Sequence, residues 1–131
     1  MRAKRVLTWL GGLAMVAIGV SHFVDPDPFV RIVPSVLPWP LALVYISGFF
    51  EILGGLGLLH PRTRRAAAWG LIALYVAVFP ANLNMAINEI QLTAGGDLPV
   101  WAIWARLPLQ AVFIAIAYWF TRPDERPGAI N

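Results

Sequence analysis

The sequence predicts an all-α integral membrane protein, a bundle of four transmembrane helices with both termini in the cytoplasm. Of the 131 residues, 59% are hydrophobic and only 13% are charged, whereas about 25% of the residues of a soluble domain are charged. The apolar residues gather into four runs of about 20 residues, the length that crosses a bilayer core of about 30 Å. Basic residues lie between these runs, and all but two of them fall on one predicted side.

The four apolar runs define the predicted spans and form one membrane domain covering residues 1–131. The first run follows the basic segment Met1–Arg5, as the apolar core of a signal peptide would. No small-x-small cleavage site follows it, so we interpret it as a retained first helix. The spans are Val6–Val24, Leu41–Leu59, Ala66–Asn88 and Val100–Phe120.

Charges and tryptophans between the spans predict the orientation. Basic residues precede the first span, separate the second from the third, and follow the fourth, whereas the other side holds Arg31 and four acidic residues. The positive-inside rule therefore places both termini in the cytoplasm. The six tryptophans lie near predicted span ends, as expected of a residue that favours the headgroup layer.

The predicted outer segment Asp25–Pro40 contains five prolines but also many apolar side chains, which a fully solvated loop would not carry. Asp27 can cap a short helix that has Pro28 at its first position. We expect a stiff segment with a short interfacial helix on the outer surface of the bundle. It is either an interfacial connection or a lid over a pocket.

Polar side chains inside lipid are costly, so each needs a partner or a purpose. Five of them fall in the predicted outer half of the spans: His22, Glu51, Asn82, Arg106 and Gln110. At 1.5 Å per residue, Glu51 lies about 15 Å into its span and Arg106 about 9 Å into its own. The inner half holds almost nothing comparable. This cluster is the candidate site, and no catalytic residue is assigned within it.

Helical spacing predicts that the cluster points into the bundle. Small residues share one helical face with Glu51 and another with His22, and membrane helices approach closely along such faces. An arginine in lipid requires either a partner or a side chain that snorkels to the outer interface, and Glu51 and Arg106 are predicted to form an ion pair. The cluster is either a structural clamp or a polar pocket that opens outward or toward lipid. Pro80 and Pro108 suggest helices that bow apart around it.

Several kinds of site are not expected. The chain has no cysteine, which excludes disulfides and thiolate metal ligands. No metal-ligand spacing or phosphate-binding loop is present. His60 lies a span away from His22, so the two cannot ligate one haem. The net charge of +3 comes from arginines at span ends rather than along one face, so nucleic acid is not an expected partner.

Five motifs follow one another along the chain from about Val16 to Trp119: Gly19–Phe23, Val33–Pro40, Tyr45–Gly48 with Glu51 and Gly54–Gly55, Phe79–Met85, and Arg106–Gln110. In this order they resemble the DoxX-like family of small bacterial membrane proteins. The resemblance implies a multi-pass protein of the bacterial inner membrane, linked to quinone or other redox chemistry, but it supplies no catalytic residues.

Three functions remain open. The first is a quinone-linked redox subunit, which would receive electrons through a partner subunit or a bound quinone, with no covalently bound cofactor. The second is a non-enzymatic membrane subunit that anchors or assembles a partner. The third is a binder or carrier of a small lipophile or anion at Arg106. A transporter of this size would need a homo-oligomer, and no inverted repeat is visible.

Overall fold

The computed structural model describes residues 2–124, and every regular element in that range is a helix. Four helices are long and apolar enough to cross a membrane, and their bounds lie close to the predicted spans. The largest difference is the first helix, which begins at Arg2 rather than at Val6. The helices are α1 (Arg2–Val24), α2 (Asp27–Ile32), α3 (Pro40–Leu59), α4 (Arg64–Ile87) and α5 (Val100–Thr121).

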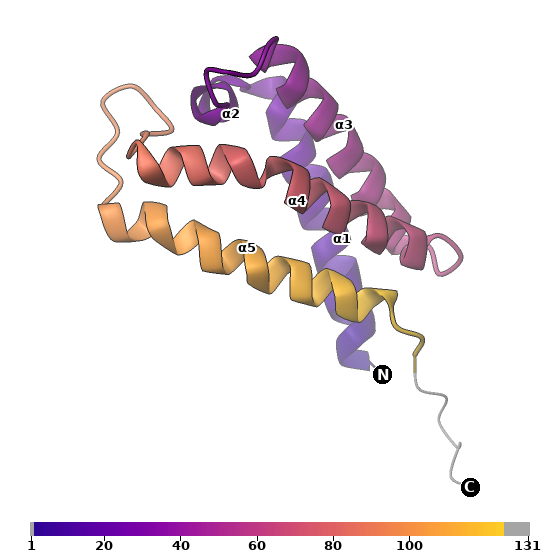
Figure 1. Cartoon of the computed structure of the whole chain (residues 1–131). Coiled ribbons are helices and arrows are strands. Elements are labelled where there is room, and N and C mark those ends of the chain that lie inside the picture. The colour runs from indigo at the N-terminus through magenta and orange to yellow at the C-terminus, as the bar shows by residue number, and fades with distance from the viewer. Residues whose placement is uncertain (1, 125–131) are drawn as a thin grey trace, which may run out of the picture.

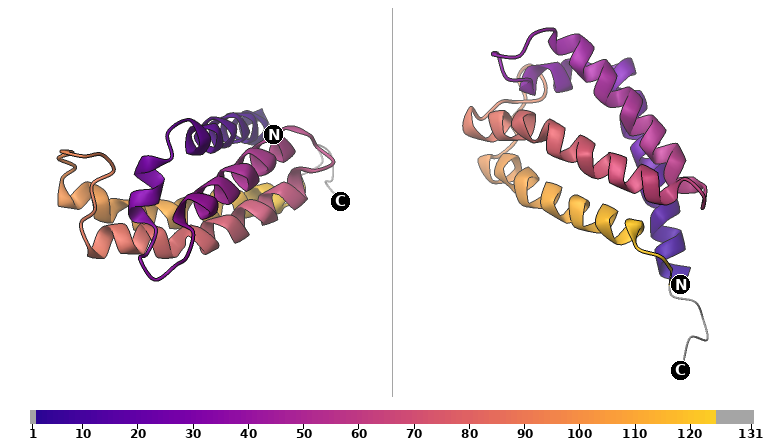
Figure 2. Two further views of the ribbon diagram at one scale, coloured as in Figure 1. Left: turned by 90° about the horizontal axis from the view of Figure 1, so that it is seen from above. Right: turned by 45° about the vertical axis from the view of Figure 1, so that its right-hand side comes forward.

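The four long helices pack as two antiparallel pairs. α1 packs against α3, α4 packs against α5, and the two pairs meet along α3 and α4 (Figure 1). α3 and α4 are closest near the turn that joins them and diverge toward the end that carries α2 (Figures 1 and 2). We call these two ends of the bundle the turn end and the α2 end.

Glycines bring the backbones of α1 and α3 into direct contact. A Cβ atom added at Gly19 would lie 2.8 Å from the carbonyl oxygen of Gly48, and one added at Gly55 would lie 2.6 Å from that of Gly12. Both distances are too short for any real side chain, so only glycine fits here. The predicted close approach along small-residue faces is therefore confirmed, and His22 and Glu51 are buried beside it.

The short helix α2 lies across the α2 end, where α3 and α4 diverge (Figure 1). Its last residue, Ile32, packs into a small apolar core with residues of α4 and α5. The Asn84 side chain also donates a 2.9 Å hydrogen bond to the Ile32 carbonyl. The predicted short helix is thus confirmed, packed onto the bundle on one side.

The predicted cap of α2 is wrong. Asp27 is already the first helical residue, Pro26 occupies the N-cap position, and no side chain caps the helix. A carboxylate in the first turn still faces the positive end of the helix dipole. The prolines therefore set the start of α2 by fixing the backbone, without a capping hydrogen bond.

At the turn end, Lys4 joins the start of α1 to the residues after α5. Its buried ammonium lies 3.0 Å from the Asp124 carboxylate and donates a 2.7 Å hydrogen bond to the Arg122 carbonyl. The hydrogen bond that Lys4 donates to the Asp124 carboxylate holds the pKa of Asp124 below its usual value. The contact closes the bundle where α1 and α5 come together.

Candidate functional site

The five residues of the predicted cluster divide into two pairs and one separate arginine. His22 of α1 and Glu51 of α3 form the first pair, and Asn82 of α4 and Gln110 of α5 form the second. Arg106 joins neither pair within residues 2–124. Each pair thus belongs to one of the two helix pairs of the bundle.

His22 is held in place on three sides. Its Nδ1 lies 2.8 Å from the Ile18 carbonyl oxygen in the preceding turn of α1. Its ring stacks on the ring of Phe29 from α2, with centroids 3.8 Å apart and planes 15° apart. A Cβ atom at Gly48 would lie 2.6 Å from that of His22, so the glycine makes room for the imidazole. Helix α2 therefore covers the histidine.

The geometry of His22 and Glu51 implies a shared proton. A carbonyl only accepts hydrogen bonds, so Nδ1 carries a hydrogen, and in the neutral ring Nε2 is then an acceptor. Nε2 faces the Glu51 carboxyl oxygen at 3.5 Å. Two bare acceptors would repel each other, so the contact is favourable when either the imidazole or the carboxyl group carries a further proton. The pair is a buried acid–base couple between α1 and α3.

Gln110 joins α5 to α4 with both ends of its amide. It donates to the Tyr75 carbonyl, and its oxygen accepts a hydrogen bond from Asn82. These bonds lie on either side of Pro80, so α4 and α5 do not bow apart from each other at this level. Both helices run on through their prolines.

Tyr75 is a further member of the network that the sequence analysis missed. Its hydroxyl lies 2.9 Å from the Met15 sulfur, so this side chain of α4 reaches α1. The sequence does contain a sign of this role, because Tyr75 lies seven residues before Asn82 and therefore shares its helical face. Through Tyr75 and Gln110, polar contacts link α1, α4 and α5.

The predicted ion pair of Glu51 with Arg106 is wrong. Within residues 2–124, Glu51 pairs with His22, and Arg106 forms no ion pair and no side-chain hydrogen bond. The physical reason is the order of packing, since α5 packs mainly against α4 and α1 packs against α3. Arg106 is half-buried, so its guanidinium retains donors that no described side chain uses.

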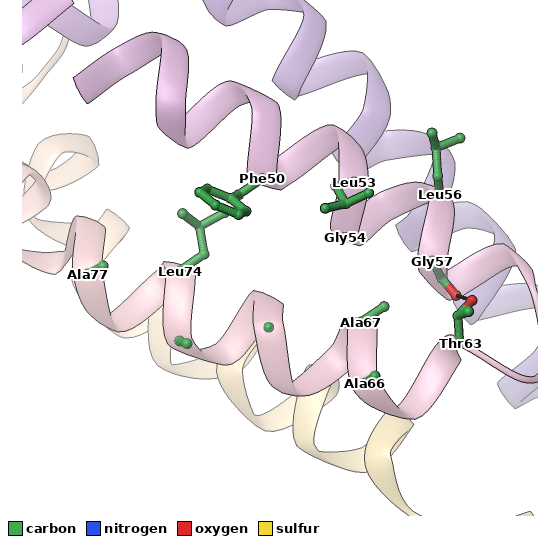
Figure 3. Close-up of a pocket in the computed structure, with 12 residues that line it drawn as sticks. Phe50, Leu53, Gly54, Leu56, Gly57, Thr63, Ala66, Ala67, Leu74 and Ala77 are labelled. Atoms are coloured by element: carbon green, nitrogen blue, oxygen red, sulfur yellow. Dashed lines mark hydrogen bonds between the residues drawn. The ribbon is translucent and has the colours of Figure 1, made fainter. Parts of the chain in front are cut away.

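A groove of about 780 Å³ lies between α3 and α4 on the outside of the bundle (Figure 3). Its walls are apolar or small side chains, among them Phe50, Leu53, Gly70 and Leu74. None of the five predicted site residues lines it. The polar pocket expected around those five residues stays a prediction. No group of three or more metal-ligating side chains gathers among residues 2–124.

Comparison with known proteins identifies a different family from the one that the motifs suggested. A family model described as "Domain of unknown function (DUF8561)" matches residues 10–121. No curated protein and no solved structure matches the chain. The DoxX-like resemblance is therefore wrong. Its motifs consisted largely of closely packed glycines and helix-interior prolines, which many membrane helices share for packing reasons.

Proposed function

The chain belongs to this family of domains of unknown function, and we propose from its own site that it is a multi-pass membrane protein that binds a small amphiphile. The polar head of the ligand would contact the His22–Glu51 pair beneath α2, and its apolar part would lie toward lipid. The observation that carries the proposal is a buried acid–base pair between two apolar helices, covered by the Phe29 ring.

The proposed orientation has both termini in the cytoplasm and the α2 end outside. The α3–α4 turn carries arginines, and exposed tryptophans occur at both ends of the bundle, including Trp39 and Trp101 at the α2 end and Trp69 at the turn end. This distribution suits two headgroup layers and a cytoplasmic turn end. The bacterial inner membrane is the proposed location.

Reporter fusions test this orientation. A reporter after Asn131 and one inserted between Glu89 and Asp97 are expected to report opposite sides of the membrane, because an odd number of spans separates the two positions. An alkaline phosphatase reporter should be active only in the inserted position, and a fluorescent cytoplasmic reporter only at the terminus. Activity of one reporter at both positions would contradict the four-span topology.

We infer the ligand site from the free energy that it costs to bury its polar groups among apolar helices. An ionisable pair inside apolar helices requires a gain that offsets its desolvation, and such residues commonly mark binding or proton-transfer sites. His22 and Glu51 together offer one mobile proton. These groups suit an uncharged head with carbonyl acceptors, and a membrane quinone is the ligand class that combines such a head with an apolar tail.

Redox chemistry is a further step in this proposal. Reduction of a quinone to a quinol takes two electrons and two protons. The couple would transfer the protons one at a time and regain its proton from water between the two transfers, whereas the two electrons would come from a partner subunit. A membrane subunit that only anchors or assembles a partner is the alternative. It predicts a bound protein and no bound amphiphile.

Titration of a decyl-substituted benzoquinone into the purified protein tests the proposal. Saturable binding is expected, and Glu51→Gln and His22→Gln should each weaken it about tenfold, the value of a hydrogen bond to a charged group. Phe29→Ala should weaken it as well by exposing the His22 ring. The matched control is Glu89→Gln, which changes an exposed carboxylate in the α4–α5 connection and should bind as the unmodified protein does.

The outcomes separate the candidate roles. Equal binding by all four variants would show that the quinone does not occupy the His22–Glu51 site. Absence of saturable binding to the unmodified protein would reject a quinone-type ligand. Circular dichroism of each variant shows whether a loss of binding reflects a loss of fold.

A further inference from the structure

The groove between α3 and α4 is about as long as one leaflet of a bilayer is thick, and it lies at one end of the bundle. Its α4 wall contains small residues from Ala66 to Ala77, a distance of about 16 Å at 1.5 Å per residue. This is about half of a hydrocarbon core of about 30 Å. The groove begins at the turn end, beside Thr63, and stops before the polar residues at the α2 end (Figure 3).

The walls of the groove are apolar and present no side chain that is free to form a hydrogen bond with a ligand. The one hydroxyl among the lining residues, Thr63, donates to the Gly57 carbonyl within the protein. Phe50, Leu53 and Leu74 form the sides, and the small residues of α4 form the floor (Figure 3). An unbranched hydrocarbon chain fits such a surface, because it needs length and apolar contact but no hydrogen bond.

The mouth of the groove lies beside a positive patch. Arg62 and Arg65 are exposed on and next to the α3–α4 turn, one to three residues from groove-lining positions. Arg64 in the same turn directs its Nε to the Leu58 carbonyl, 3.0 Å away. The acidic residue described at this end, Asp124, is paired with Lys4. The patch is therefore complementary to an anionic headgroup.

We propose that the groove holds an acyl chain of an anionic phospholipid from the leaflet at the turn end, with the phosphate at Arg62 and Arg65. A transmembrane helix from a second copy is a poorer fit, since a helix seam would run through both leaflets over about 20 residues. The proposal requires that the chain lies in a bilayer, but it is independent of any ligand beneath α2.

Native mass spectrometry with phosphatidylglycerol and phosphatidylcholine of identical acyl chains tests the proposal. We expect one phosphatidylglycerol to be retained in preference to phosphatidylcholine. The double variant Arg62→Gln/Arg65→Gln should reduce that preference about 25-fold, from a contribution of about fivefold for each arginine near an anionic headgroup. It should leave the retention of phosphatidylcholine unchanged.

Filling the groove gives the second arm of the test. A Cβ atom at Gly70 meets nothing within 4 Å, so Gly70→Leu extends into the groove without disturbing the fold. This variant should lose both lipids. Ala115→Leu, at an exposed position of α5 away from the groove, should retain them. Equal retention of the two lipids by the unmodified protein, or unchanged retention by Gly70→Leu, would overturn the proposal. So would a dimer that Gly70→Leu converts to a monomer without loss of lipid.

Discussion

Replacement of Gly48 by alanine is expected to lower the free energy of unfolding by about 3 kcal/mol, at the upper end of the usual cost of overpacking. The added methyl group would lie 2.6 Å from the Cβ of His22 and 2.9 Å from the carbonyl oxygen of Gly19. One of these neighbours belongs to the backbone of α1, so the helices themselves would have to separate. Loss of contact between α1 and α3 would also displace His22 from Glu51.

Gly70 provides the matched control for this substitution. It lies in the interior of α4, where an added Cβ meets nothing within 4 Å. Gly70→Ala is therefore expected to stabilise the helix by about 0.5–1 kcal/mol through the lower chain entropy of alanine. Both variants are compared by denaturant unfolding in the same detergent. Equal effects of the two substitutions would show that α1 and α3 do not meet along Gly19 and Gly48.

Replacement of Glu51 by glutamine is expected to cost roughly 3 kcal/mol, because it breaks a buried pair and leaves the His22 imidazole without its partner. The structure identifies that partner as His22, 3.5 Å away, and not as Arg106. A double-mutant cycle of Glu51→Gln with His22→Gln should therefore show a coupling energy of about 1 kcal/mol or more. The same cycle with Arg106→Gln should be additive within about 0.5 kcal/mol.

The two cycles give opposite results under the two pairing schemes. Strong coupling of Glu51 to Arg106, together with additive effects of the Glu51 and His22 substitutions, would contradict the His22–Glu51 pair. It would support the ion pair of Glu51 with Arg106 that the sequence predicted. Glu89→Gln, an exposed carboxylate at the α2 end, measures the background effect of losing one negative charge. Unfolding midpoints at a single pH suffice for the comparison.

The helices were predictable from the sequence because each long helix coincides with an apolar run of spanning length. The apolar runs ended near the helix ends of the structure, and Pro28 lies in the first turn of α2, one residue from its predicted place. The burial of His22 and Glu51 followed from the small residues on their helical faces. These are one-dimensional features, which depend on the order and spacing of residues along one helix.

The pairing of Glu51 was not predictable from depth and charge alone. Depth places Glu51 and Arg106 at related levels but does not say which helices are neighbours. The missed signal was a matching spacing of seven residues, Gly12 to Gly19 in one span and Gly48 to Gly55 in another. In the antiparallel packing of these two faces, Gly19 meets Gly48, and His22 and Glu51 lie on opposite sides of that contact, each three residues beyond its glycine. Helical side chains lean toward the N-terminus of their helix, so the two side chains reach back toward the contact and meet.

The groove was not predicted from the sequence, because it arises where residues with small side chains leave space. Ala66, Gly70, Ala73 and Ala77 repeat at intervals of four, three and four residues, which places them on one face of α4. Small residues on such a face predict close packing of a helix, as between α1 and α3. Here α3 instead leaves the face open and contributes large side chains at the edges. Whether a small-residue face is filled by a neighbouring helix depends on the tertiary arrangement.

Native mass spectrometry of the protein after mild extraction from its membrane tests the proposed ligand site most directly. We expect the protein to retain one small amphiphile besides phospholipid, and we expect Glu51→Gln to lose it while Gly70→Leu and Glu89→Gln retain it. A protein that carries no such amphiphile and instead retains a stoichiometric partner subunit, equally in Glu51→Gln and in the unmodified form, would contradict the account. The His22–Glu51 pair would then be a structural clamp between α1 and α3.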